Sequence, residues 1–149
     1  MYLVKTIKLF DDNNIFFCDP IKNNVMNDGN FIRIIYSTDV VAFNGIYLLI
    51  TLNDVTCEKY YSKYRCKFNV SSHANIINDL KMIEENILKK YSVPNKTPQY
   101  KIYEQIKNGY IKIFFDIEKK PETMFNLKIS GIWETDENYG LTYKFTKIN

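Results

Sequence analysis

The chain has 149 residues, and this length predicts a single domain, 1–149. Hydrophobic residues make up 46% and charged residues 25%, which excludes intrinsic disorder, collagen and a coiled coil. The sequence has no run of 18 apolar residues, so we expect neither a membrane span nor a membrane partner. The net charge of +3 is too small to indicate a polyanionic ligand by itself.

The first third of the chain predicts strands that are separated by polar turns. In chain order, these strands are expected at 2–10, 14–18, 31–37 and 46–52. The first two would make 1–18 an N-terminal hairpin or a pair of edge strands. Residues 19–30 are rich in Asn, Asp, Pro and Gly and predict a loop.

Residues 60–70 predict a strand because their side chains alternate in character. The lysines and the arginine in this segment, Lys63, Arg65 and Lys67, occupy every second position. Successive side chains of a strand point to opposite faces, so these three cations share one face and the apolar residues between them share the other.

One helix, about 73–91, is predicted by apolar residues that recur at three- and four-residue steps. Ser71 or Ser72 is expected to cap it. Residues 98–107 are ambiguous. Pro98 and Gly109 suit the ends of a helix, whereas Asn108-Gly109 also predicts a hairpin turn, so both helix and strand are left open.

The last part of the chain predicts a strand at 110–115 and a hairpin whose arms are 125–134 and 139–146. Strands that are joined by turns around one helix predict a β-rich (α+β) fold. We expect an OB-fold-like small barrel, or a strongly bent antiparallel sheet, with one main helix and an OB-like core over 31–147.

Positive charge is concentrated in the middle of the chain. Residues 55–120 hold thirteen basic and seven acidic side chains, a net charge of +6, whereas the flanking parts are slightly acidic. Aromatic residues alternate with these cations, and single-stranded nucleic acid requires both, because bases stack on rings and phosphates attract cations. The residues expected to bind nucleic acid are Arg33, Tyr36, Tyr47, Lys63, Arg65, Lys67, Lys112, Trp133, Tyr143 and Lys144.

Catalysis is not indicated by any motif. His73 is the only histidine, and the three cysteines show no spacing that is typical of a metal site. Nucleophile elbows and phosphate-binding glycine loops are missing from the sequence as well. We therefore expect a protein that is not an enzyme, with no cofactor, no metal and no catalytic residues, in a reducing compartment.

Two segments carry a family resemblance. They are the strand 31–37 with the turn and strand start at 44–47, and the pair 128–135 and 139–145. Together they resemble small OB-fold-like single-stranded DNA-binding proteins of large eukaryotic (nucleocytoplasmic) DNA viruses. The resemblance implies a viral protein that coats exposed strands in DNA replication, repair or recombination. It also implies an intracellular location, in the viral factory of the host cytoplasm or in the nucleus.

The functional hypothesis is therefore sequence-tolerant binding of single-stranded DNA. The alternative is a non-catalytic protein-interaction or virion structural module, since interfaces also favour Tyr and Trp. The sequence leaves several properties open. These are the preference for DNA or RNA, sequence specificity, protein partners and assembly into a homo-oligomer.

Overall fold

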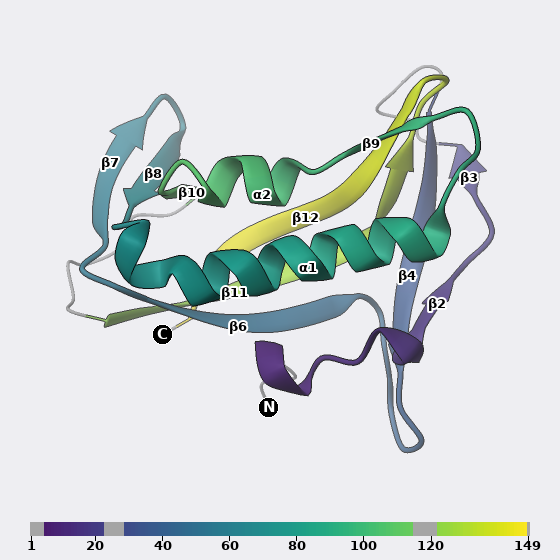
Figure 1. Cartoon of the computed structure of the whole chain (residues 1–149), viewed down its shortest axis with the longest axis horizontal. Helices are drawn as coiled ribbons and strands as arrows, with labels where there is room; N and C mark the ends of the chain where they lie inside the picture. Colours follow the sequence, from purple (N-terminus) through teal and green to yellow (C-terminus); the bar gives the residue numbers. More distant parts are fainter. Residues whose placement is uncertain (1–4, 23–28, 115–121, 149) are drawn as a thin grey trace.

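The computed structural model describes residues 5–22, 29–114 and 122–148 (Figure 1). The elements follow in chain order: β1 (Lys5–Thr6), η1 (Ile7–Leu9), η2 (Asp12–Asn14), β2 (Ile15–Phe17), β3 (Ile21–Lys22), β4 (Asn30–Ser37), β5 (Ala42–Phe43), β6 (Ile46–Asn53), β7 (Thr56–Tyr60), β8 (Lys63–Lys67), η3 (Ser71–His73), α1 (Ala74–Tyr91), β9 (Thr97–Gln99), α2 (Lys101–Ile106), β10 (Tyr110–Ile113), β11 (Glu122–Glu134) and β12 (Asn138–Ile148). Nine strands form one sheet, and β10, β8 and β7 form a second, smaller sheet.

The long strand β11 organises the large sheet. One edge of it pairs with β12 from Met124 to Glu134. The other edge pairs first with β6, up to Ile129, and then with β4 from Gly131 onward. A Cβ atom at Gly131 would collide with the carbonyl oxygen of Ile32 and would lie 2.6 Å from the Phe31 ring, so this crossing of strands needs a glycine. The sheet is strongly curled and forms a half-barrel.

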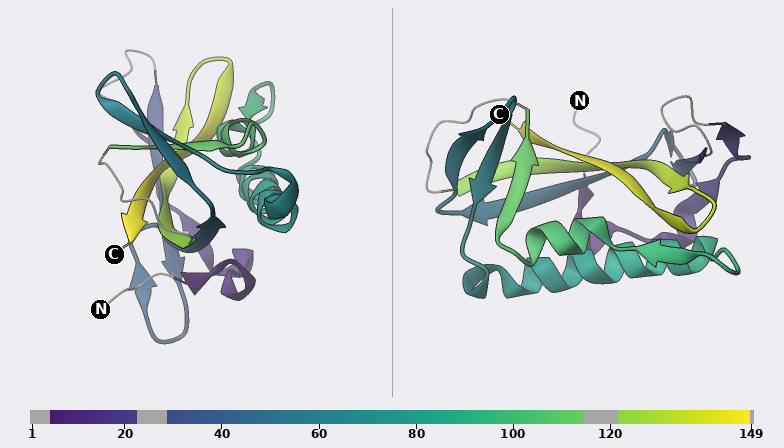
Figure 2. Two further views of the ribbon diagram at one scale, coloured as in Figure 1. Left: turned by 90° about the vertical axis from the view of Figure 1, so that its left-hand side faces the viewer. Right: turned by 90° about the horizontal axis from the view of Figure 1, so that it is seen from above.

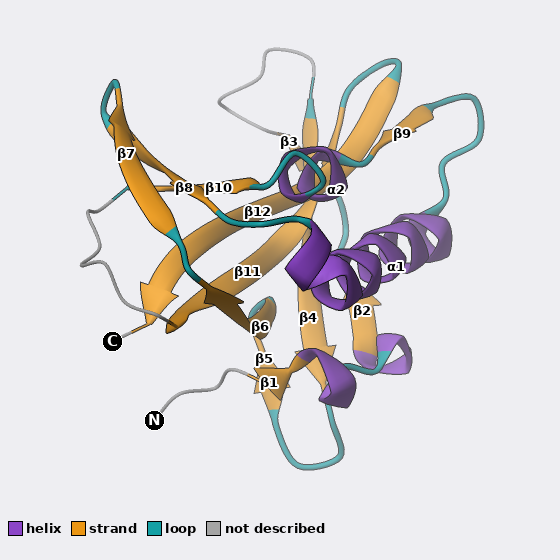
Figure 3. Cartoon of the chain, turned by 60° about the vertical axis from the view of Figure 1, so that its left-hand side comes forward, coloured by secondary structure: helices purple, strands orange, loops and turns teal. Residues whose placement is uncertain are grey.

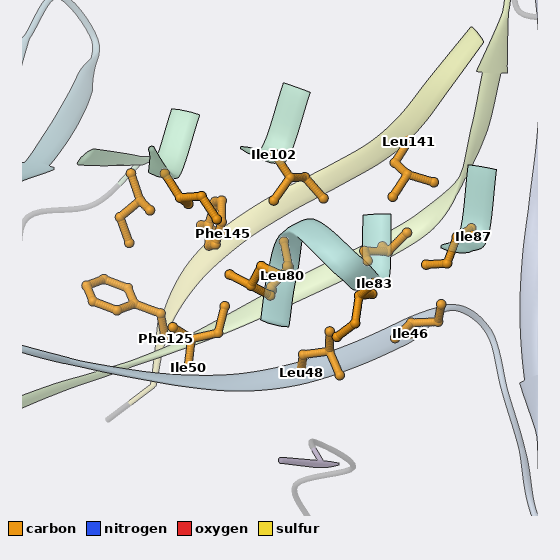
Figure 4. Close-up of a cluster of buried hydrophobic side chains, with 14 of the residues drawn as sticks. Ile46, Leu48, Ile50, Leu80, Ile83, Ile87, Ile102, Phe125, Leu141 and Phe145 are labelled. Atoms are coloured by element: carbon orange, nitrogen blue, oxygen red, sulfur yellow. The ribbon is translucent and has the colours of Figure 1, made fainter. Parts of the chain in front are cut away.

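The main helix α1 lies along one face of this half-barrel, with the shorter α2 beside it (Figure 2). Leu80, Ile83 and Ile87 of α1 pack against side chains from β6, β11 and β12 (Figure 4). Their three- and four-residue spacing is the pattern that predicted the helix. The predicted β-rich fold with a strongly bent sheet and one main helix is therefore confirmed.

The start of α1 differs from the prediction, because neither Ser71 nor Ser72 caps it. The ring of His73 lies at this position, and the side chain is 3% exposed. Its Nε2 accepts a hydrogen bond from the backbone N–H of Asn53 at 2.9 Å, so its Nδ1 is the donor to the carbonyl of Asn69 at 2.6 Å. His73 thus ties the end of β6 to the start of the helix.

The small sheet stands beside one end of the large one (Figure 3). The strand predicted from 60–70 is in fact β8, and it forms a hairpin with β7, which the sequence analysis did not predict. Tyr61 has a φ of 57° at the turn between them. On its other side, β8 pairs with β10. The expected strand at 110–115 corresponds to β10, although residue 115 lies outside the described residues.

Of the two alternatives for 1–18, a hairpin or edge strands, the described residues form short edge strands and not a hairpin. β1 pairs in parallel with β6, and β2 pairs with β4, so these two strands do not pair with each other. Two turns of 3-10 helix separate them, and the Asp11 side chain accepts from the N–H of Asn13 to hold the second turn. Residues 2–4 of the predicted first strand lie outside the described residues.

The ambiguous segment 98–107 contains both a short strand and a helix. β9 pairs in parallel with the start of β12, and α2 follows from Lys101. The Glu84 carboxylate of α1 accepts hydrogen bonds from the backbone N–H groups of Ile102 and Tyr103, both at 2.9 Å. This buried acceptor satisfies donors that the first turn of any helix leaves unpaired.

Candidate nucleic-acid interface

The outward face of the small sheet combines aromatic rings with cations. In the register of β10, β8 and β7, Lys112 lies beside Arg65, and Tyr110 lies beside Lys67. Cys66 and Ile111 point to the opposite face and are buried. We call the outward side the ring-and-cation face; its rings and cations are Tyr60, Lys63, Arg65, Lys67, Tyr110, Lys112 and Phe114. One carboxylate, Glu58 of β7, also lies on this face, opposite Arg65.

Arg65 lies at the centre of this face between two rings. The guanidinium carbon is 4.7 Å from the centroid of Tyr60 and 4.6 Å from that of Tyr110. Its Nε is buried and has no hydrogen-bond partner among the described residues. A ring face attracts a cation without carrying a full negative charge. Among the described residues Arg65 forms no salt bridge, although Glu58, which pairs with Lys67, lies opposite it in the register.

Lys63 and Lys144 lie over Phe114 at the edge of the ring-and-cation face, and Lys112 lines the same pocket. The Nζ of Lys63 is 5.5 Å from the Phe114 centroid, and the Nζ of Lys144, on β12, is 4.9 Å from it. Lys112 lies next along β10, with its Nζ 5.9 Å from Tyr110. Phe114 and the three lysines line a pocket of about 320 Å³. Its other lining residues are Gln105, Ile113, Tyr143 and Phe145. The lining includes no carboxylate.

The helix α2 provides one wall of this pocket through Gln105. Its side-chain NH₂ donates to the hydroxyl of Tyr143 at 3.0 Å, and its carbonyl oxygen accepts from the backbone N–H of Lys112, also at 3.0 Å. Gln105 therefore connects β10 with β12. Desolvation of the half-buried ring raises the pKa of Tyr143, so its hydroxyl is neutral and can both accept and donate a hydrogen bond.

Glu84 controls the position of α2 from inside the core. Burial raises the pKa of Glu84 to about 7, against the opposing effect of the two backbone N–H donors. Its side chain is 1% exposed, so this carboxyl has no contact with the ring-and-cation face. It supports the pocket only through the helix that carries Gln105.

The structure brings together six of the ten residues that the sequence analysis selected. They are Lys63, Arg65, Lys67, Lys112, Tyr143 and Lys144. Of these, Lys67 forms a salt bridge with Glu58, with 3.2 Å between Nζ and Oε2. Its charge is partly neutralised, and it contributes less positive potential than the other cations.

Arg33 and Tyr47 lie together at a second place. Arg33 is exposed, and its guanidinium donates to the Asn44 side chain at 2.8 Å. The Tyr47 hydroxyl contacts the carbonyl of the same asparagine at 3.4 Å. The Nζ of Lys128, which the sequence analysis did not select, is 5.5 Å from the Tyr47 centroid.

Tyr36 and Trp133 lie outside both groups. Tyr36 is 1% exposed, and its hydroxyl accepts from the N–H of Asp11 at 3.0 Å, so it is a core residue that cannot stack on a base. Trp133 is half-buried and covers Gly140, where a Cβ atom would lie 2.7 Å from the indole. Trp133 lies five positions after Lys128 on β11, which is about 17 Å along a strand.

Phe114 and Gln105 are residues of the candidate interface that the sequence analysis did not select. A signal for Phe114 was present, since Tyr110, Lys112 and Phe114 occupy alternate positions and therefore share a face. Gln105 could not be found in this way, because its role depends on how α2 packs against β10 and β12.

Comparison with known proteins adds nothing to this geometry. No family model matches the chain, and no curated protein or solved structure is significantly similar to it. Within 5–22, 29–114 and 122–148, no helix is long and apolar enough to cross a membrane. The same residues contain no group of three or more His, Cys, Asp or Glu side chains that could hold a metal ion.

Proposed function

We propose that the chain binds single-stranded DNA without sequence preference, through the ring-and-cation face. The observation that carries this proposal is a pocket that Lys63, Lys112 and Lys144 line together with the exposed ring of Phe114, and whose lining has no carboxylate. Proteins that bind single strands combine a cationic groove for the backbone with rings for the bases. The small sheet offers both within one face.

Each component has a distinct role in this proposal. Phe114 is 47% exposed and Tyr60 is 46% exposed, so nearly half of each side chain remains accessible to a base. Stacking of one base contributes about 1–3 kcal/mol and tolerates any base, because every base has a π-face. The ammonium groups of Lys63, Lys112 and Lys144 attract the phosphates between the stacked bases.

The biological role in this proposal follows the resemblance: coating of exposed strands in viral DNA replication, repair or recombination. A protein with that role binds any sequence and releases it as salt concentration rises. Contact with four phosphates gives a log–log slope of affinity against salt near −3, from about −0.7 for each phosphate on a single strand.

The deciding experiment is fluorescence anisotropy with a labelled oligo-dT strand at two salt concentrations. We expect the double variant Lys63→Glu with Lys112→Glu to lower affinity at least tenfold. The matched control is Lys59→Glu with Lys89→Glu, which changes the net charge equally. Lys59 belongs to β7 but points away from the ring-and-cation face, and Lys89 is exposed on α1. Circular dichroism establishes that both variants fold.

If both double variants lose affinity for oligo-dT equally, the effect of charge is non-specific, and the proposed interface is contradicted. Absence of binding to single-stranded DNA by the unmodified protein would contradict the function itself. Duplex DNA and RNA oligonucleotides in the same assay measure the preference for the type of nucleic acid. Binding of an acidic peptide in place of every oligonucleotide would favour the protein-interaction alternative.

A further inference from the structure

The face of the large sheet that points away from the helices carries a second row of cations. Tyr47 of β6, Lys128 of β11 and Lys144 of β12 are direct neighbours in the strand register. Adjacent strands are about 4.8 Å apart, so the row from Tyr47 to Lys144 spans about 10 Å across three strands. It runs perpendicular to the strands and ends at the proposed interface.

Lys144 belongs to both surfaces. Its Nζ lies 4.9 Å from the Phe114 centroid, at the pocket of the ring-and-cation face. At the other end of the row, Lys128 lies over Tyr47, and Asn44 connects Tyr47 with Arg33. Side-chain contacts and the strand register together connect cations and rings from Lys63, through Phe114, Lys144, Lys128, Tyr47 and Asn44, to Arg33.

The surroundings of this row are neutral. The residues that flank it on the same face are Asn126 and Ser130 on β11, and Thr142 and Thr146 on β12. In the described parts of the chain, neither Lys128 nor Lys144 forms a salt bridge. Two neighbouring cations without a carboxylate between them raise the local positive potential, which a phosphate backbone would lower.

We propose that a bound single strand continues from the pocket across β12, β11 and β6, over Lys144, Lys128 and Tyr47, to Arg33. This inference rests on the proposed function and adds the direction and the length of the site. A short oligonucleotide fills the ring-and-cation face alone. A longer one also contacts Lys128 and Arg33, and it binds more tightly with a steeper salt dependence.

The test compares oligo-dT strands of about 4 and about 12 nucleotides, which lie within the range of site sizes for small single-strand-binding domains. We expect Lys128→Glu to weaken binding of the longer strand about threefold or more and to reduce its salt slope by about 0.7. The shorter strand should bind Lys128→Glu with the same affinity as it binds the unmodified protein. Lys89→Glu is the matched control, and Lys128→Ala provides a second variant without charge reversal.

The outcomes separate the two proposals. If Lys128→Glu and Lys128→Ala leave the affinity for both oligo-dT strands unchanged, the extended path is wrong and the proposed function stands. If Lys128→Glu weakens both strands equally, Lys128 serves the short footprint and the extension is also wrong. If the unmodified protein binds neither strand, the proposed function fails, and the extension fails with it.

Discussion

Substitution of Glu84 by Gln should remove a specific pH dependence of stability. The carboxyl group is buried, and its pKa rises from 4.5 to about 7 in the folded protein. The native state therefore holds this proton more tightly than the unfolded state does. The resulting stabilisation is fully present below pH 4.5 and is lost as the pH rises through 7. A shift of this size corresponds to about 3 kcal/mol at most.

The assay is the free energy of unfolding in urea, measured from pH 4.5 to pH 8 for the unmodified protein and for Glu84→Gln. Glu84→Gln keeps the shape of the side chain, but its NH₂ group faces one of the two backbone donors of α2. We expect a cost of about 1–3 kcal/mol at acidic pH, where the unmodified protein is most stable. This difference should shrink or reverse toward pH 8. Parallel curves for the two proteins would refute the reasoning, since all other ionisable groups cancel in the comparison.

Two further substitutions test separate parts of the structure. Tyr36→Phe removes the acceptor for the N–H of Asp11, so we expect about 1 kcal/mol lower stability in urea and unchanged affinity for oligo-dT. Gln105→Ala removes the link to the Tyr143 hydroxyl and should lower affinity several-fold with little loss of stability. Gln99→Ala, which breaks a similar side-chain hydrogen bond at the far end of β12, should leave affinity unchanged.

Local periodicity predicted much of the small sheet and the helix. The alternation in 60–70 placed Lys63, Arg65 and Lys67 on one face, as the register of β8 has them. The same rule could have excluded Tyr36. It shares its face of β4 with Ile32 and Ile34, which are fully buried, whereas Arg33 points the other way and is exposed.

Contacts between segments that are far apart in the chain could not be predicted from local sequence patterns. The choice between helix and hairpin at 98–107 depends on Glu84, eighteen residues before the first N–H group that it binds. The half-buried position of Trp133 depends on Gly140, across the hairpin. Glu84 supplies a hydrogen-bond acceptor, and Gly140 leaves room for the indole ring of Trp133. Neither arrangement follows from a local pattern, because each exists only after the chain has folded.

Cations of the ring-and-cation face that contact aromatic rings are better suited to bind a phosphate than cations that contact a carboxylate. A lysine paired with a carboxylate, as Lys67 is with Glu58, must give up that partner before it can bind a phosphate. A lysine over a ring, as Lys63 is over Phe114, is held in place while its N–H donors stay available. Rings therefore position these charges without neutralising them. For this reason Lys63 and Lys112, rather than Lys67, are the residues whose reversal should abolish most of the affinity.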